Sequence, residues 1–182
     1  MADAKAAREF SKRWARRGDE QQDTQKFWID LLVNVLGVPS ASIDRYVDFE
    51  RKVKGRRIDV FVEDHHFLCE QKSLGIDLDQ PEVRQKRLET PYQQATWYAQ
   101  NLPYSVRPRW LMTCNFGTFR LYDLDEDNPD LSMVEFPLEK LADNLHNLSF
   151  LTSDKTSRLY QEQQLSVEAG RYVTALYDAL SK

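Results

Sequence analysis

Three charged residues interrupt two otherwise apolar runs between residues 56 and 73. Asp59 lies in "RRIDVFVE", and Glu70 and Lys72 lie in the next run, "HFLCEQKS". Two neighbouring carboxylates can hold one Mg²⁺ or Mn²⁺ ion, whose octahedral shell is completed by water, a backbone carbonyl and substrate phosphate. A lysine beside them would reach the attacking water or the phosphate being cleaved. Together these groups carry the chemistry of a metal-dependent phosphodiesterase.

A tight turn at Asp64 and His65 would bring the three charges together. In that register Asp59 lies opposite Glu70, and two like charges in this position destabilise a strand pair by up to about 1 kcal/mol. A sequence that keeps such a pair is therefore expected to use it. The period of two predicts one charged face and one core face. The charged face holds Arg57, Asp59, Glu70 and Lys72, and the core face holds Ile58, Val60, Val62, Phe67 and Cys69.

Other interpretations of these residues stay open. Lys72 could form a surface salt bridge with one carboxylate on a solvent-facing sheet, and a register slip of one residue would separate Asp59 from Glu70. A second Glu-x-Lys, beginning at Glu50, lacks a preceding strand that could present an aspartate. His65 and His66 point to opposite faces of a strand, so they are predicted to be turn residues and not a metal site.

The elements expected around the charges form an α/β fold, with helices flanking a mixed sheet. Thr90 and Pro91 are a cap and a first-turn proline. Gly18, Gly37 and Pro103 mark helix ends. The spacing predicts helices over 2–17, 20–36 and 90–101, strands over 45–53, 56–63, 66–73, 109–116, 118–124 and 131–137, and a loop over 74–89.

Composition excludes several classes of protein. The net charge of -4 argues against a general nucleic-acid coat, although basic residues gather in "AKAAREFSKRWARRG" and "RKVKGRR". No run is apolar enough for a membrane span or a secretory signal, which predicts a cytoplasmic protein without a membrane partner. Cys69 and Cys114 lie in apolar runs and are expected to be reduced and buried.

At Asp59 and "Glu70-Gln71-Lys72" the sequence resembles the PD-(D/E)xK nuclease superfamily. The blocks "DEQQDTQKFWIDLL", "EQKSLGIDL", "TPYQQATWYAQNLPYSVRPRW" and "MTCNFGTFRLYD" resemble the N-terminal region of MmeI-type restriction-modification enzymes. The resemblance implies a restriction-endonuclease-like fold, metal ligands at Asp59 and Glu70, and a catalytic lysine at Lys72. The proline that often precedes the aspartate is Ile58 here.

The resemblance also implies secondary site residues. Glu20 is the candidate for a further acidic ligand, although the helix dipole also explains a first-turn glutamate. Gln94 and Tyr98 match a Gln-x-x-x-Tyr element of related nucleases and share one helix face. The expected cofactor is Mg²⁺ or Mn²⁺, and the expected substrate is double-stranded DNA.

The expected organisation has three parts: a basic helix over 1–18, a nuclease domain over 19–152 and the start of a helical connector over 153–182. The resemblance implies that an adenine methyltransferase and a target-recognition domain follow in the full-length protein. Two other functions remain open. One is a non-catalytic module that contacts DNA through "RKVKGRR", and the other is a stand-alone repair or recombination nuclease.

Overall fold

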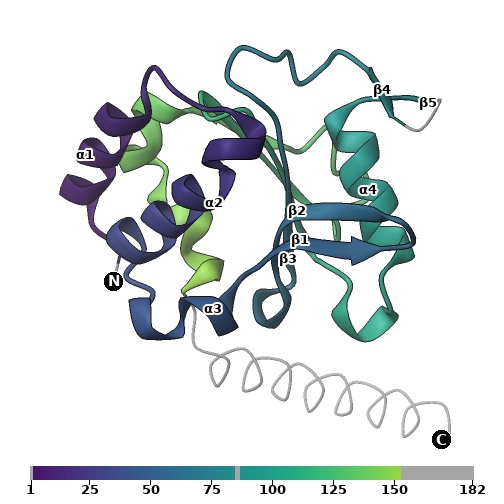
Figure 1. Cartoon of the computed structure of the whole chain (residues 1–182), viewed down its shortest axis with the longest axis horizontal. Coiled ribbons are helices and arrows are strands. Elements are labelled where there is room, and N and C mark those ends of the chain that lie inside the picture. The colour runs from purple at the N-terminus through teal and green to yellow at the C-terminus, as the bar shows by residue number, and fades with distance from the viewer. Residues whose placement is uncertain (1, 85–86, 153–182) are drawn as a thin grey trace, which may run out of the picture. The chain divides into compact units, whose positions relative to one another are not determined.

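A six-stranded mixed sheet forms the centre of the protein, in the order β1-β2-β3-β6-β7-β8. The structure is a computed structural model that describes residues 2–84 and 87–152. Neighbouring strands of this sheet are antiparallel except β3 and β6, which are parallel and are joined by a crossover through α4 (Figure 1). The strands are β1 Asp48–Val53, β2 Arg56–Val62, β3 Phe67–Gln71, β6 Trp110–Cys114, β7 Thr118–Asp123 and β8 Val134–Pro137.

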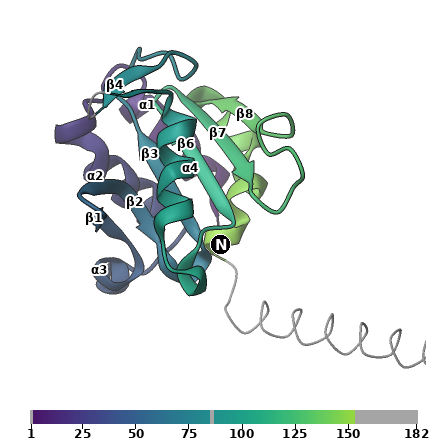
Figure 2. The same ribbon diagram turned by 90° about the vertical axis from the view of Figure 1, so that its right-hand side faces the viewer.

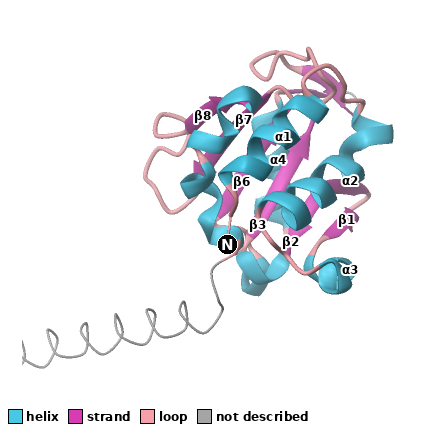
Figure 3. Cartoon of the chain, turned by 90° about the vertical axis from the view of Figure 1, so that its left-hand side faces the viewer, coloured by secondary structure: helices cyan, strands magenta, loops and turns pink. Residues whose placement is uncertain are grey.

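Helices cover both faces of this sheet, which confirms the expected α/β class. Helices α1 and α2 lie across one face (Figure 3), and α4 lies across the other (Figure 2). The helices are α1 Ala4–Trp14, α2 Glu20–Asp30, α3 Ile43–Tyr46 and α4 Pro91–Asn101. A π-helical turn, Leu31–Val35, extends α2, and 3-10 turns occupy Ser40–Ser42, Glu63–His65, Tyr104–Val106, Leu138–Asp143 and Leu145–Leu151.

Two apolar cores result, one on each side of the sheet. On the α1 and α2 side, Phe10, Phe27 and Trp28 are buried against strand residues such as Val60 and Cys69. On the α4 side, Phe61 and Leu68 are buried against residues of α4. Both faces of the sheet are therefore covered by apolar side chains over most of their area. A polar side chain on a central strand is usually buried as a result.

Local sequence explains where the two helices nearest the motif begin. Asp19 caps α2, because its side chain accepts hydrogen bonds from the N–H groups of Gln21 and Gln22. Thr90 and Gln93 form a capping box at α4, and Pro91 occupies the first turn. Both starts agree with the sequence prediction.

Two expectations were wrong. The segment expected to be a loop over 74–89 contains a two-stranded hairpin, β4 Glu82–Arg84 and β5 Arg87–Glu89. Ile58 packs in the α4-side core with Phe61 and not with Val60. The regular alternation fails at the point where β2 stops pairing with β3, beyond Val60, and where Glu50 on the adjacent strand adopts a left-handed backbone with φ 56°. The predicted connector over 153–182 lies outside the described residues.

Two smaller expectations can also be checked. Cys69 and Cys114 are free and buried, as predicted, and burial raises the pKa of the Cys114 thiol to about 12. Among the residues that the structure describes, no helix has the length and apolar character needed to cross a bilayer.

Candidate active site

The hairpin of β2 and β3 has the predicted register, with Val60 opposite Cys69 and Val62 opposite Phe67. His66 closes the turn by donating its N–H to the Glu63 carbonyl at 3.0 Å. Backbone pairing stops at Val60. The Asp59 side chain then accepts a hydrogen bond of 2.6 Å from the N–H of Gln71. This bond holds the Asp59 carboxylate beside the motif on β3 even though the two strands separate.

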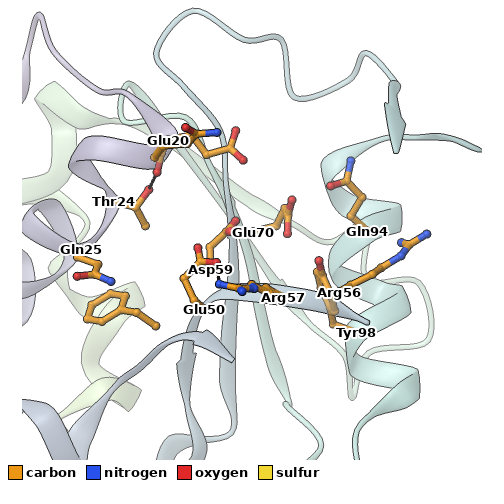
Figure 4. Close-up of a pocket in the computed structure, with 12 residues that line it drawn as sticks. Glu20, Thr24, Gln25, Glu50, Arg56, Arg57, Asp59, Glu70, Gln94 and Tyr98 are labelled. Atoms are coloured by element: carbon orange, nitrogen blue, oxygen red, sulfur yellow. Dashed lines mark hydrogen bonds and ion pairs between the residues drawn. The ribbon is translucent and has the colours of Figure 1, made fainter. Parts of the chain in front are cut away.

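A cleft of about 540 Å³ opens where β2 leaves β3 (Figure 4). Helix α2 supplies one wall and α4 the other, while β2 and β3 form the floor. The predicted acidic residues and the predicted helix pair all border this one space. The bordering side chains include Glu20, Glu50, Asp59, Glu70, Gln94 and Tyr98.

Lys72 is the most deeply buried charge of the site, with no exposed surface. Its Nζ lies 2.7 Å from Glu70 Oε1 and 3.5 Å from Glu82 Oε2. It also donates a hydrogen bond of 3.2 Å to Gln94 Oε1. The alternative of a solvent-facing salt bridge is therefore wrong, because the pair lies under α4. Removing Lys72 and Glu70 from water costs several kcal/mol, which their ion pair repays only if its geometry is good. A salt bridge on the surface would not carry this cost.

Gln71, the middle residue of the motif, points to the opposite face. Its Oε1 accepts a hydrogen bond of 3.0 Å from the indole N–H of Trp28, and its Nε2 donates to the Lys72 carbonyl at 3.1 Å. The backbone N–H of Gln71 binds Asp59 at the same time. This residue thus fixes β3 between α2 and the Asp59 carboxylate.

Glu20 is placed by contacts from the residues that follow the motif. The N–H of Glu20 donates to Ser73 Oγ at 3.0 Å, and the N–H of Leu74 donates to the Gly18 carbonyl at 2.8 Å. The start of α2 is therefore attached directly to the end of β3. This attachment sets Glu20 at the border of the cleft, where the sequence hypothesis needs it.

The charges in the cleft repel one another. Burial, followed by the negative charge of Glu70, raises the pKa of the Asp59 carboxyl well above its usual value. The Gln71 N–H and Lys72 offset only part of this rise. A divalent cation between the two carboxylates would remove the repulsion, so Asp59 and Glu70 fit such an ion in both type and charge.

Glu20, the candidate for a third metal ligand, is less well placed than Asp59 and Glu70. Within residues 2–84 and 87–152, no three Asp, Glu, His or Cys side chains are close enough together to form a complete metal cluster. Mg²⁺ is commonly held by one or two carboxylates together with waters and substrate phosphates. Asp59 and Glu70 meet that requirement, while Glu20 borders the cleft without completing a triad.

Several residues of the site were not predicted. Arg56 forms an ion pair of 2.7 Å with Glu89 and lies over the Trp97 ring at 4.4 Å. Glu82, from β4, approaches Lys72 as described above, and Glu50 borders the cleft next to Arg57. The contacts of Arg56 and Lys72 with Glu89 and Glu82 depend on the β4–β5 hairpin, whose short polar strands have no periodic signal. Only their charge density, in "PEVRQKRLE", set the segment apart in sequence.

Gln94 and Tyr98 share one face of α4, as the sequence predicted. Gln94 and Tyr98 are both buried on the side of α4 that faces the sheet, and both border the cleft. Gln94 connects two parts of the site, because it accepts from Lys72 and donates to the Glu89 carbonyl at 3.2 Å. It thereby fixes the orientation of the Lys72 ammonium group.

Comparison with known proteins gives one match. The family model described as "MmeI, N-terminal domain" matches residues 5–182, nearly the whole chain. No curated protein and no solved structure matches the chain.

Proposed function

Because the chain belongs to the MmeI N-terminal domain family, we propose that it is the nuclease domain of a restriction-modification protein. Its reaction is the hydrolysis of phosphodiester bonds in double-stranded DNA, with Mg²⁺ or Mn²⁺ as cofactor. A methyltransferase and a target-recognition domain in the same full-length protein would supply modification and sequence choice.

One observation carries this proposal. Asp59 and Glu70 border the same cleft, and the fully buried Lys72 contacts one of them at 2.7 Å. This arrangement lowers the stability of the folded state, because it places two carboxylates together and raises the pKa of the Asp59 carboxyl. Structural ion pairs do not require a second, opposed carboxylate, whereas a metal-dependent phosphodiesterase does.

Each residue then has a role. Asp59 and Glu70 would hold the metal, which when bound would supply an activated water and neutralise charge on the phosphate. Lys72 directs its ammonium group at the attacking water or at charge that develops on the phosphate oxygens. Gln94 orients that ammonium group, and Tyr98 forms the wall beside it. Glu20 is placed to bind a water of the metal shell.

The basic run over 51–57 gives less support to a purely DNA-contacting module. Arg51 is paired with Glu63 at 2.7 Å, and Arg56 is paired with Glu89 at the same distance. Charges that are already paired contribute less to phosphate binding, because their neutralisation releases fewer counterions. The module remains the outcome that a failed metal titration would favour.

The test is calorimetric titration of the 182-residue chain with Mg²⁺ and Mn²⁺. Wild type should give a binding heat that Asp59→Ala abolishes. Asp127→Ala, which removes an exposed carboxylate from a distant turn, should bind as wild type does. A wild type that binds neither ion would overturn the nuclease proposal.

Lys72→Ala separates metal binding from catalysis. The ammonium group does not ligate the ion, so the variant should still bind Mn²⁺ in the same titration. Cleavage, measured in the full-length protein, should fall below detection. The variant should also lose about 3 to 5 kcal/mol of stability, because Glu70 remains buried without its partner. Wild-type cleavage in a folded Lys72→Ala protein would remove this residue from the mechanism.

A further inference from the structure

Glu82 is a carboxylate beside the catalytic lysine to which the proposed reaction gives no role. It lies on β4, at the base of the β4–β5 hairpin, which Figure 1 shows near the start of α4. Its Oε2 lies 3.5 Å from Lys72 Nζ, and 33% of its side chain is exposed, whereas the Lys72 side chain has no exposed surface. A fully buried cation thus has a partly exposed carboxylate next to it.

The opposite strand of the hairpin fixes where Glu82 points. The register places Glu82 directly opposite Glu89, and directly opposed residues project from the same face of a strand pair. Glu89 is paired with Arg56 at 2.7 Å, and its carbonyl accepts a hydrogen bond from Gln94. The face that carries both glutamates is therefore the one that contacts the site. Arg56 offsets the charge of one glutamate, and Lys72 offsets that of the other.

Lys72 Nζ is held by more than one side chain. It lies 2.7 Å from Glu70 Oε1, 3.2 Å from Gln94 Oε1 and 3.5 Å from Glu82 Oε2. An ammonium group has three N–H donors, so it can serve these oxygen atoms together. The shortest of these distances is to Glu70, the carboxylate that the proposed function assigns to the metal.

Metal binding at Glu70 would leave Lys72 in need of another countercharge. A divalent cation is a larger charge than an ammonium group, and the two repel each other strongly where water is excluded. A buried charge that loses its partner destabilises the folded state. Gln94 offers an acceptor without a charge. Glu82 offers a full negative charge on a separate element, so the lysine keeps a carboxylate whatever Glu70 binds.

We propose that Glu82 is a positioning residue for Lys72, which supplies the countercharge of the buried ammonium group when Glu70 holds a metal ion. The inference rests on the proposed function, since it assigns a further residue to the same reaction. Glu82 acts through Lys72, and not on the metal or on DNA. Without Glu82 the lysine would depend on Glu70 and would compete with the metal for that carboxylate.

Calorimetric titration of the 182-residue chain with Mn²⁺ tests this inference without any cleavage. Glu82→Gln keeps the size of the side chain and removes its charge. The variant should bind Mn²⁺ about 3- to 10-fold more weakly than wild type, the coupling expected within one network of ion pairs. In a Lys72→Met background no ammonium group competes for Glu70, so the same change should alter the affinity by less than about 2-fold.

Cleavage kinetics of the full-length protein give a second measurement. Glu82→Gln should lower kcat about 10- to 100-fold, as loss of a group that orients a site residue does. The KM for DNA should stay within about 2-fold of wild type, because Glu82 is not assigned a contact with the substrate. A glutamate that only stabilised the fold would not divide its effect between kcat and KM in this way.

Two control variants separate the charge of Glu82 from the hairpin and from ion pairs in general. Val83→Ser changes the next residue of β4, which is 72% exposed and points to the other face. Glu135→Gln removes a glutamate that is paired with Arg120 on the edge strand β8. Both should bind Mn²⁺ within about 1.5-fold of wild type. Thermal melting in EDTA verifies that every variant folds, and Glu82→Gln should melt within about 2 °C of wild type, because Glu70 still pairs with Lys72.

Each contrary outcome has its own meaning. A Glu82→Gln protein that binds Mn²⁺ as wild type does would overturn the inference and leave the proposed function standing. An equal loss of affinity in the Lys72→Met background would overturn it too, because Glu82 would then act on the metal directly. The same loss in Val83→Ser would assign the effect to the hairpin as a whole. A wild type that binds no Mn²⁺ would overturn the proposed function, and this inference with it.

Discussion

At the scale of single residues, Asp59 combines an unfavourable position with a specific hydrogen bond. Its carboxylate lies near Glu70 in a partly buried cleft, and it accepts a hydrogen bond of 2.6 Å from the Gln71 N–H. A carboxylate whose pKa is raised in the folded state destabilises that state at neutral pH. The fold therefore carries a local cost that binding of a cation would remove.

Asp59→Asn should stabilise the metal-free protein. Asparagine keeps an oxygen that can accept from the Gln71 N–H, but it removes the charge that repels Glu70. The gain expected from one lost repulsion is about 1 kcal/mol, or roughly 2 to 4 °C in melting temperature for a chain of this size. Differential scanning calorimetry in EDTA measures it. Asp127→Asn, on an exposed turn, should not change the melting temperature.

Addition of Mg²⁺ or Mn²⁺ should reverse the order of the melting temperatures of wild type and Asp59→Asn. A ligand that binds only the folded state stabilises it, so the metal should raise the melting temperature of wild type and not that of Asp59→Asn. An Asn variant that melts below wild type in EDTA would contradict the idea that charge repulsion dominates at this position.

At the scale of elements, the β4–β5 hairpin depends on its ion pairs. A two-stranded hairpin is only marginally stable alone, and these strands bury little apolar surface. The pair between Arg56 and Glu89, both about nine-tenths buried in their side chains, connects the hairpin to β2. The Arg56 guanidinium also lies over Trp97 of α4. One arginine thus holds three elements together.

Glu89→Gln should destabilise the protein in a pH-dependent way. Hydrogen bonds from Arg56 lower the pKa of the Glu89 carboxyl in the folded state. The resulting stability is fully present above about pH 4.5, the range of an unperturbed glutamate, and is lost as the pH falls through the lower folded-state pKa. At pH 7 the variant should lose about 1 to 3 kcal/mol.

Urea unfolding at pH 7 and pH 3 measures this effect. The gap between wild type and Glu89→Gln should narrow at pH 3, because wild type loses the contribution that the variant lacks. Glu139→Gln, at an exposed position, serves as the control. A gap of equal size at both pH values would show that packing, and not the ion pair, accounts for the loss.

Most of the site could be predicted from sequence because its main contact is local. The turn over Glu63–His65 fixes the register of β2 and β3, and beyond the last pair the Asp59 side chain binds the N–H of Gln71, next to Glu70. The capping residues of α4 likewise fix the phase of Gln94 and Tyr98. Where local signals are strong, the chain specifies both the element and the face.

The errors arose where position depends on distant residues. Ile58 lies where β2 no longer pairs with β3 and where the left-handed Glu50 leaves a gap in the pairing with β1. The hairpin formed by Glu82 to Glu89 is held by Lys72 and Arg56, which are remote in sequence. Neither effect leaves a periodic pattern in the segment itself.

At the scale of the molecule, the net charge of -4 argues against extensive binding to nucleic acid by this chain alone. The described helices bury most of their apolar faces in the two cores, and α2 turns the exposed Gln21 and Gln25 towards the cleft. Phosphate contacts give affinity without sequence preference. Specificity would then come from other parts of a full-length protein.

A plasmid assay tests this expectation. The 182-residue chain with Mg²⁺ should cut supercoiled DNA poorly, and any ends should map to no common sequence. Binding should weaken steeply between 50 and 200 mM salt, as for other phosphate-dominated contacts. The Asp59→Ala protein, purified in parallel, controls for contaminating nucleases. Efficient cutting at one defined sequence would require base recognition within these residues and would contradict the expectation.

The hydrogen bonds of the cleft join segments that lie at increasing distances along the chain. The bond between Asp59 and Gln71 spans 12 residues, that between Lys72 and Gln94 spans 22, and that between Glu20 and Ser73 spans 53. Local hairpins form within microseconds, whereas contacts between distant segments form later because closing longer loops costs more entropy. We therefore expect the hairpin that brings Asp59 to the backbone of Gln71 to form early, and the contacts of α4 and α2 with it to form later. A partly folded chain would then hold Asp59 beside β3 before α4 and α2 complete the two walls of the cleft.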